Sequence, residues 1–260
     1  MEFRGEARVI IQGALTGKVA IVTGARMGIG ESIAAGLAEA GADLMLISRR
    51  ISEDDEVVKV CRGLGRRVEV MQVDVANRAQ VKEMVERTIA VLGKVDILFN
   101  NAGISKPGML WKITDEQWDA VIDVNLKGTF NCIAEVSKPM MEQKSGSIIN
   151  VTSSAGVLGT IGQVNYTAAK GGVLAMSRSC AKELAKYGVT VNTIAPMAET
   201  EMTRKIMTDP KIAPTYLARI PMGRFCKPEE VVPAVVFLAS DGASYITGQL
   251  ICIDGGMVMP

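Results

Sequence analysis

Tyr166 and Lys170 are the side chains whose types and spacing most directly suggest chemistry in this sequence. They lie four residues apart, and on a helix such residues share a face and their side chains can meet. An ammonium group beside a phenol stabilises the phenolate, so we expect Lys170 to lower the pKa of Tyr166 from its ordinary value of about 10. The pair could then exchange a proton near neutral pH.

The composition gives this pair added weight, because the sequence contains no histidine. That absence excludes a Ser-His-Asp triad and the common histidine-containing metal sites. The five cysteines are scattered without a C-x-x-C pair, so neither a disulfide framework nor a zinc site is expected. We predict no bound metal.

Charge and hydropathy limit the classes of partner. A net charge of +1 gives no general attraction to nucleic acids or acidic membranes. No apolar run approaches the roughly 18 residues of a membrane-spanning helix, and residues 1–17 show no signal-peptide hydrophobic region. We therefore predict a cytoplasmic protein that binds neither nucleic acid nor membrane.

Short apolar runs alternate with helical stretches along the chain. Most runs are apolar throughout, which is typical of parallel strands covered on both faces. The expected strands are 18–23, 43–48, 68–73, 95–99, 147–152, 190–195 and 250–253, and the expected helices are 28–40, 52–63, 78–92, 114–143, 165–187 and 228–238. Repeated βα units predict an α/β fold with a single doubly wound, Rossmann-like parallel sheet and helices on both faces.

One domain over residues 1–260 is the simplest organisation, with 1–14 as an N-terminal extension, because no Pro-, Gly- or Ser-rich linker interrupts the pattern. The Met-rich segment 197–222 breaks the alternation of strands and helices. It follows the sixth strand, at the carboxyl edge where such sheets bind ligands. We expect it to cover the substrate, because long inserted segments are often functional. An ordinary pair of surface helices is the alternative.

A glycine-rich turn follows the first expected strand, at residues 23–30. Glycines there allow a tight turn and the close approach of a pyrophosphate to the N–H groups of a helix N-terminus. The spacing is G-x-x-x-G-x-G rather than G-x-G-x-x-G, and a tight turn without a ligand is the alternative. The residues predicted to bind a dinucleotide here are Gly24, Arg26, Met27, Gly28, Ile29 and Gly30.

The end of the second expected strand indicates which dinucleotide binds. An acidic residue there would bond the ribose hydroxyls of NAD, whereas an arginine accommodates the 2′-phosphate of NADP. This sequence has Ser48 and Arg49 and no acid, and a guanidinium group matches a phosphate with paired hydrogen bonds. Arg26 could add to the same pocket. We therefore predict NADP rather than NAD, with solvated loop charges as the alternative.

Further motifs follow in a characteristic order, each weak alone and specific together. They are Thr23-Gly24-(x)3-Gly28-Ile29-Gly30, Asp74-Val75, Asn100-Asn101-Ala102-Gly103, Asn125, Ser153, Tyr166-(x)3-Lys170, Asn192-(x)2-Ala195-Pro196 and Asp254-Gly255-Gly256. Through these motifs the sequence resembles the single-domain branch of the short-chain dehydrogenase/reductase family, over residues 15–257.

The resemblance implies an enzyme that transfers a hydride between a nicotinamide cofactor and a carbonyl or secondary alcohol without a metal. Tyr166 would be the general acid that gives its proton to the carbonyl oxygen. Lys170 would lower the Tyr166 pKa and hold the nicotinamide ribose, and Ser153 would polarise the carbonyl. Asn125 would position a water that links Lys170 to solvent.

The resemblance also implies contacts to the adenine, the ribose and the nicotinamide carboxamide of the cofactor. The residues are, in that order, Asp74 and Val75; Asn101, Ala102 and Gly103; and Pro196 and Thr200. The family usually has Gly after the Pro and Thr five residues past it, whereas here Met197 replaces the Gly and the Thr comes one residue early. Because Met adopts positive φ less readily than Gly, we expect a different backbone path.

Within the family, the sequence is similar to 3-oxoacyl-carrier-protein reductases and to gluconate-type dehydrogenases. We favour the first, which implies a small carbonyl or alcohol substrate that can be carrier-bound. Such enzymes often dock an acidic carrier with basic residues; Lys144 occupies one such position, and Tyr187 stands at the other. Segments 154–163 and 197–222 carry few charges, so we expect a moderately apolar substrate. The alternatives are a sugar or gluconate-type dehydrogenase using NAD(P), a non-catalytic dinucleotide-binding regulator, or a scaffold protein.

The resemblance extends to assembly. Helices corresponding to 114–143 and 165–187 form dimer faces in this family, and the C-terminal strand region helps to complete tetramers. Trp111 and Trp118 lie at or near the start of the first helix, where large aromatic side chains more often serve packing than cofactor stacking. We therefore predict a homotetramer with two-fold symmetry.

Overall fold

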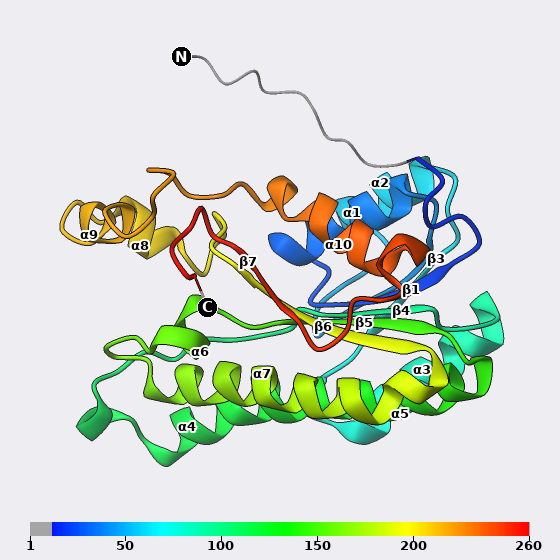
Figure 1. The fold of residues 1–260 in the computed structure, drawn as a ribbon, viewed down its shortest axis with the longest axis horizontal. Helices are drawn as coiled ribbons and strands as arrows, with labels where there is room; N and C mark the ends of the chain where they lie inside the picture. Colours follow the sequence, from blue (N-terminus) through cyan, green and yellow to red (C-terminus); the bar gives the residue numbers. More distant parts are fainter. Residues whose placement is uncertain (1–11, 260) are drawn as a thin grey trace.

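The computed structural model describes residues 12–259, which form one seven-stranded sheet with helices on both faces (Figure 1). Most of the predicted extension 1–14 lies outside the described residues. The strands are β1 (Val19–Thr23), β2 (Asp43–Ser48), β3 (Val68–Gln72), β4 (Ile97–Asn100), β5 (Gly146–Val151), β6 (Val189–Pro196) and β7 (Leu250–Ile253). All neighbouring strands are parallel, so the predicted fold class is confirmed.

The strand order β3-β2-β1-β4-β5-β6-β7 reverses direction at β1. Sheets of this type bind ligands at such a switch point, in the crevice outside the carboxyl ends of the strands. In the pairing of β1, Val19 lies opposite Asp43 of β2 and Ala20 lies opposite Ile97 of β4. This register brings the glycine turn after β1 and the Asn101 segment after β4 to the same edge.

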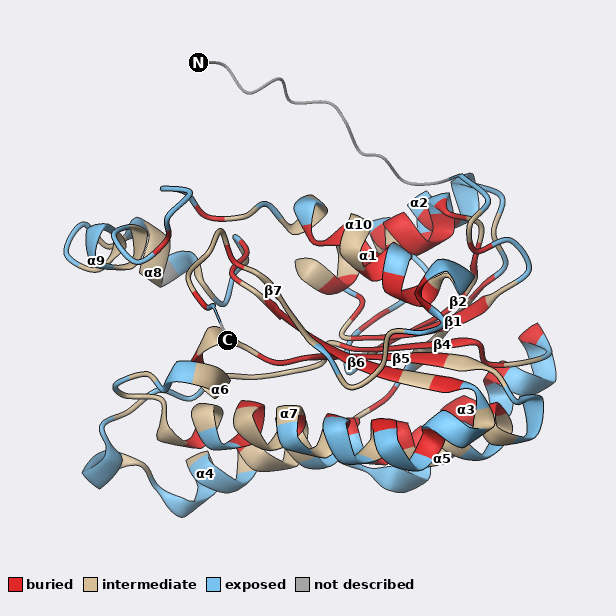
Figure 2. Cartoon of the chain, in the orientation of Figure 1, coloured by how far each residue is buried: buried red, intermediate tan, exposed pale blue. Residues whose placement is uncertain are grey.

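Two helical layers cover the sheet, one on each face, and both contain buried residues (Figures 1 and 2). One layer holds α1 (Ile29–Glu39), α2 (Glu56–Gly63) and α10 (Val232–Ala239), and the other holds α3 (Arg78–Leu92), α4 (Asp115–Ile122), α5 (Gly128–Gln143) and α7 (Val164–Leu184). A separate hydrophobic cluster forms on each face, around Leu44 and Phe99 on the first and around Ile21 and Met45 on the second. Burial of this apolar surface stabilises both layers, at about 25 cal/mol per Å².

The single helix predicted over 114–143 is wrong, because the structure divides it into α4, a π-helical turn at Asp123–Lys127, and α5. In the π turn, the Gly128 N–H donates to the Asp123 carbonyl, five residues back. The Thr129 hydroxyl donates to the Asn125 carbonyl at 2.8 Å. Such turns often occur at functional sites, and this one contains Asn125.

Three short helices lie where the sequence pattern predicts none: α6 (Ser154–Leu158), α8 (Arg204–Thr208) and α9 (Ala213–Leu217). Each has about the length of one turn and a half, too short to show helical periodicity. α8 and α9 belong to the segment 197–222, and Figure 1 shows them beyond the end of the sheet. The predicted helices 165–187 and 228–238 each include a 3-10 turn, at Ala185–Tyr187 and Pro228–Glu230.

Within residues 12–259, no helix is both long and apolar enough to cross a membrane. The same part of the chain contains no group of three or more His, Cys, Asp or Glu side chains placed to hold a metal ion. All five cysteines are free thiols, and Cys61 and Cys132 are buried.

Candidate active site

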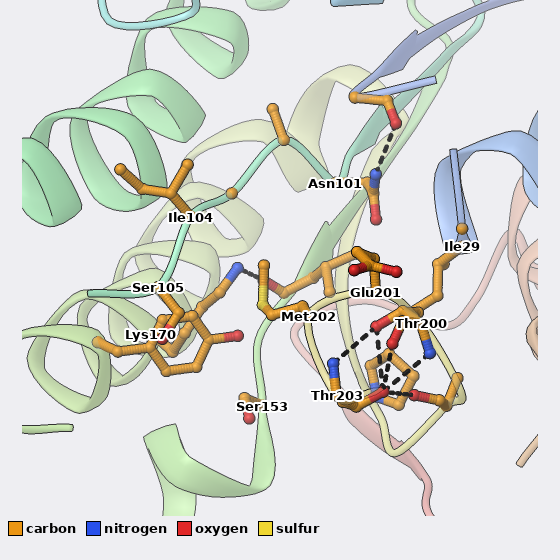
Figure 3. Close-up of a pocket in the computed structure, with 18 of the residues that line it drawn as sticks. Ile29, Asn101, Ile104, Ser105, Ser153, Lys170, Thr200, Glu201, Met202 and Thr203 are labelled. Carbon is orange, nitrogen blue, oxygen red and sulfur yellow. Dashed lines mark hydrogen bonds between the residues drawn. The ribbon is translucent and has the colours of Figure 1, made fainter. Parts of the chain in front are cut away.

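A cavity of about 370 Å³ opens at the carboxyl edge of the sheet, between the glycine turn, the start of α7 and the segment after β6 (Figure 3). The predicted site residues that line it are Gly24, Arg26, Met27, Gly28, Ile29, Arg49, Asp74, Val75, Asn101, Ala102, Gly103, Ser153, Tyr166, Lys170, Pro196 and Thr200. Gly30 and Asn125 do not line the cavity. The fold therefore brings together most of the residues that the sequence singles out.

The glycine turn needs its glycines for two different reasons. Gly24 and Gly28 adopt positive φ values of 66° and 62°, which other residues rarely adopt. Gly30 has no room for a side chain, because a Cβ there would overlap the Gly24 carbonyl oxygen. Gly28 caps α1 without a side-chain hydrogen bond, so this helix N-terminus presents backbone N–H groups of the kind that bind phosphates.

Asn101 fixes the distance between the glycine turn and the segment after β4. Its amide donates to the carbonyl oxygens of Thr23 at 3.1 Å and Gly24 at 3.2 Å. In return, the Thr23 hydroxyl accepts from the backbone N–H groups of Asn101 and Ala102, at 2.9 and 3.0 Å. The Asn101 side chain thus holds the glycine turn and the segment after β4 together at the edge of the cavity.

The segment after β3 forms another wall of the cavity. The Asp74 carboxylate accepts a hydrogen bond from the Ala76 N–H at 3.0 Å. The carbonyl of Val75 accepts from the buried Asn131 amide on α5 at 2.8 Å. Gly128 at the start of α5 is required here, because a Cβ would collide with the Val75 side chain. Helix α5 therefore sets the position of this wall.

The arginines at the far end of the cavity differ in their surroundings. Arg49 and Arg50 follow β2 and are exposed. Arg26 is held by Asp55, since its Nε lies 3.1 and 3.3 Å from the two carboxylate oxygens. The same carboxylate accepts from the Ser52 N–H at 2.8 Å, next to the start of α2. Sequence reasoning misses Asp55, because nothing in its local pattern indicates a partner 29 residues away.

Tyr166 and Lys170 lie on α7 and face the cavity together with Ser153, which precedes α6. The Lys170 Nζ lies 5.8 Å from the centre of the Tyr166 ring and donates to the Val151 carbonyl at 2.8 Å (Figure 3). Ser153 caps α6 by accepting from the Ala155 N–H at 3.2 Å. The predicted proximity of these side chains is therefore present in the structure.

The predicted lowering of the Tyr166 pKa is wrong in this structure. Burial raises the pKa of Tyr166 to about 12, and only the Ser153 hydroxyl opposes that shift. Burial also lowers the pKa of Lys170 from 10.5 to about 8, because it disfavours the charged ammonium. The four-residue spacing predicts that Tyr166 and Lys170 are neighbours. Desolvation by the surrounding protein decides the direction in which the pKa of each residue shifts.

Asn125 is fully buried, and its amide is committed to one neighbour. Its Oδ1 accepts from the Ile104 N–H and its Nδ2 donates to the Ile104 carbonyl, both at 2.8 Å. Gly103 lies between Asn125 and Lys170, since a Cβ there would be 2.8 Å from Asn125 Oδ1 and 3.7 Å from Lys170 Nζ. The side chain holds the loop after β4.

The loop after β6 accommodates Met197 without a left-handed backbone conformation. Among residues 12–259, Lys144 is the only non-glycine residue with positive φ, so Met197 avoids that conformation. Met197 instead continues the strand direction, donating to the Ile253 carbonyl at 3.0 Å and accepting from the Cys226 N–H at 3.2 Å. Thr200 still reaches the glycine turn, because a Cβ on Gly28 would lie 3.4 Å from its methyl group.

Residues of the segment 197–222 line the same cavity as Tyr166. Met202, Ile206 and Tyr216 contribute apolar surface, and Glu201 contributes a carboxylate. A hydrogen bond of 2.8 Å from the Thr203 hydroxyl to the Ala198 carbonyl braces the turn before α8 (Figure 3). The segment contains the helix pair α8 and α9, as the alternative expectation had it. Because its residues also line the cavity, a role in covering the substrate stays a prediction.

Known proteins that are similar to this chain are described as enzymes, which is consistent with the geometry of the cavity. The family model described as enoyl-(acyl carrier protein) reductase matches residues 24–258. The 3-oxoacyl-[acyl-carrier-protein] reductase FabG of Thermotoga maritima is 46% identical over 248 residues, covering 94% of this chain and 99% of the relative. The 3-oxoacyl-[acyl-carrier-protein] reductase of Synechocystis is 44% identical over 249 residues, covering 95% of this chain and 99% of the relative.

A solved structure is also similar. It is described as a short-chain alcohol dehydrogenase from Sinorhizobium meliloti, with a TM-score of 0.90 and 36% identity, covering 94% of this chain and 97% of that chain. This chain belongs to the short-chain dehydrogenase/reductase family. It is therefore an oxidoreductase that acts between CH–OH and C=O groups, and its cofactor is a nicotinamide dinucleotide. The open N-terminus of α1, which begins after Gly28 without a side-chain cap, fits the phosphates of that cofactor.

The lowered pKa of Lys170 should contribute stability that grows as pH rises from about 8 to 10.5. Between these values the unfolded chain, at the ordinary lysine pKa of 10.5, binds more protons than the folded state, at about 8. The contribution of Lys170 to stability then increases with pH, with a limiting slope of about 1.4 kcal/mol per pH unit for one proton.

Denaturant unfolding of the wild type and of Lys170→Met, from about pH 7.5 to about pH 9.5, measures this effect below the ordinary Tyr pKa. The stability of the wild type relative to the variant should rise with pH. Lys182→Met removes an exposed lysine from the same helix and controls for the loss of charge. A flat or falling difference for Lys170→Met would contradict the assignment.

Proposed function

We propose that this enzyme reduces 3-oxoacyl thioesters carried on an acyl carrier protein, using NADPH. The observation that carries the proposal is the meeting of Tyr166, Ser153 and Lys170 in one cavity with the glycine turn. The names of the relatives from Thermotoga maritima and Synechocystis point to the same substrate. The reaction type and cofactor site that the cavity supports are therefore consistent with the substrate named for these relatives.

Tyr166 acts as the general acid of the reduction. A pKa of about 12 keeps its hydroxyl protonated at neutral pH, as an acid must be before it donates. The bound cofactor supplies the hydride. Tyr166 gives its proton to the carbonyl oxygen, Ser153 donates a hydrogen bond to the same oxygen, and the Lys170 ammonium stabilises the phenolate that remains.

We assign the other predicted residues to the cofactor and its surroundings. Asp74 and Val75 contact the adenine, and the segment 101–103 lines a ribose, consistent with their positions in the cavity wall. Pro196 and Thr200 lie toward the nicotinamide, and the contact of Thr200 with Gly28 supports that placement. Asn125 acts through the loop it holds, and a water that it positions between Lys170 and solvent remains our prediction.

NADP is the cofactor that the arginines favour. Arg49 follows β2 at the place where a 2′-phosphate would lie, and Ser48 precedes it. Arg26 is oriented by Asp55 through its Nε, which leaves the two terminal nitrogens of the guanidinium group for a phosphate. The Asp55 carboxylate weakens the positive potential there, so Arg49 carries most of the preference in this proposal.

The substrate side of the cavity suits an acyl group better than a sugar acid. Among the side chains that the structure describes, the only cationic ones that line the cavity are Lys170 and the three arginines at the cofactor end, so a free sugar carboxylate has no described partner on the substrate side. Met202, Ile206 and Tyr216 offer apolar surface instead. A gluconate-type dehydrogenase is therefore the weaker candidate.

Lys144, the basic residue that the resemblance assigns to carrier docking, is exposed and terminates α5 in a left-handed conformation just before β5, at the amino edge of the sheet. Gly188 leaves room for this turn, because a Cβ there would overlap the Lys144 carbonyl. Tyr187 packs against the core and beside Lys186, with the ammonium 5.0 Å from its ring centre. Lys144 and the neighbouring Lys186 bring positive charge to the amino edge of the sheet, and docking of a carrier near Lys144 remains our prediction.

We further propose a homotetramer in the cytoplasm, with dimer contacts along α4, α5 and α7. Trp118 and Phe130 lie partly exposed on these helices, at 38% and 45%. Exposed aromatic side chains of this size are enriched at interfaces. Sedimentation at micromolar concentration should give a mass of about four chains, and a stable monomer would contradict this part of the proposal.

Tyr166→Phe tests the proposed chemistry. Removing the hydroxyl should lower kcat for acetoacetyl coenzyme A by about 10² to 10⁴, with little change in the dissociation constant of NADPH. Tyr245→Phe changes a fully exposed tyrosine and serves as the matched control. Turnover is followed by nicotinamide absorbance, and a Tyr166→Phe enzyme with normal kcat would refute the mechanism.

Arg49→Ala tests the choice of cofactor. Losing charge-assisted bonds to a 2′-phosphate should weaken NADPH binding about 10- to 100-fold and leave NADH binding nearly unchanged. Arg87→Ala, which removes an ion pair with Glu69 away from the cavity, is the control. Fluorescence titration with both cofactors measures the preference, and an unchanged preference would remove Arg49 from the site.

A further inference from the structure

Asn165 is a fully buried amide that stands one residue before Tyr166. It belongs to the first turn of α7, where N–H groups have no partner within the helix. The residue that caps this helix, Gln163, provides no side-chain hydrogen bond. The Asn165 Oδ1 fills that role by accepting from the Tyr166 N–H at 2.8 Å. The backbone of the proposed acid is thus fixed by its neighbour.

The other end of the same amide reaches two further segments. The Asn165 Nδ2 donates to the carbonyl of Lys106, in the loop after β4, at 3.1 Å. It also lies 3.3 Å from the carbonyl of Gln117 in α4. One buried side chain therefore joins α7, α4 and the loop after β4. Removing it would take away a hydrogen bond from each of the three.

The loop over 104–108 is held along its whole length. Asn125 binds both backbone groups of Ile104, Asn165 binds Lys106, and the Gly108 N–H donates to the Gly162 carbonyl at 2.9 Å. The loop matters because Ile104 and the adjoining Ser105 line the cavity that Tyr166 faces (Figure 3).

We propose that Asn165 is a positioning residue for the reaction, holding the loop over 104–108 and the first turn of α7 at the separation that the substrate carbonyl requires. The inference rests on the proposed role of Tyr166 as the acid. Asn165 does not line the cavity, so it acts through Tyr166 and Ser105. Displacements of about 1 Å in such a site can cost about a hundredfold in rate.

Asn165→Ala tests this role, and Asn192→Ala is its matched control. Asn192 is equally buried and also secures a loop, donating to the Ile246 carbonyl at 2.7 Å and accepting from the Gln249 N–H at 3.1 Å. That loop precedes β7, at the amino edge of the parallel sheet and away from the cavity. Both variants should lose stability to denaturant.

The two variants should differ in catalysis. With acetoacetyl coenzyme A and NADPH, Asn165→Ala should lower kcat by about 10- to 100-fold and leave the KM for NADPH unchanged, whereas Asn192→Ala keeps the wild-type kcat. Asn165→Ser keeps a polar group in the buried position. Its hydroxyl is too short to reach both carbonyls, so kcat should fall by an intermediate factor. This variant decides the matter if Asn165→Ala does not fold.

Wild-type kcat in the folded Asn165 variants, or equal losses of kcat in Asn165→Ala and Asn192→Ala, would overturn the positioning role. Failure of the proposed function would give a different result, namely normal turnover in the Tyr166→Phe variant. If Tyr166→Phe is inactive and Asn165→Ala turns over normally, only the role of Asn165 is lost.

Discussion

The hydrogen bond from the buried Lys170 ammonium group to the Val151 carbonyl, at 2.8 Å, is the contact on which the geometry of the site depends. It links α7 to the end of β5. The Thr152 hydroxyl adds a second link by donating to the Lys170 carbonyl at 2.7 Å. Gly156 lets α6 approach closely, because a Cβ there would lie 2.7 Å from the Lys170 carbonyl carbon. The segments that carry Ser153 and Lys170 therefore form one rigid unit.

The parallel sheet brings that unit to the cofactor site. Because the strand order reverses at β1, the glycine turn after β1 and the segment after β4 meet at the carboxyl edge, where Asn101 joins them. The segment after β6 then closes the cavity from the other side, through Thr200 and Met202. A hydride donor and a proton donor can thus face one carbonyl from separate elements of one rigid scaffold.

Much of the fold and site could be predicted from the sequence, because its signals are local. Continuous apolar runs predict the parallel strands, and the Gly24 to Gly30 spacing predicts the tight turn after β1. Features that depend on distant contacts could not be predicted. The π turn at Asn125 accompanies its bonds to Ile104, and the pairing of Arg26 with Asp55 spans 29 residues. The pKa of Tyr166 likewise depends on burial rather than on spacing.

The central claim is that Tyr166 and Ser153 act on one carbonyl oxygen. It is tested most directly by a crystal structure of the wild-type protein with NADP⁺ and acetoacetyl coenzyme A, a pair that cannot react because both are oxidised. The account predicts the 3-oxo oxygen within about 3.2 Å of both Tyr166 Oη and Ser153 Oγ. An ordered substrate whose 3-oxo oxygen contacts neither hydroxyl would contradict it.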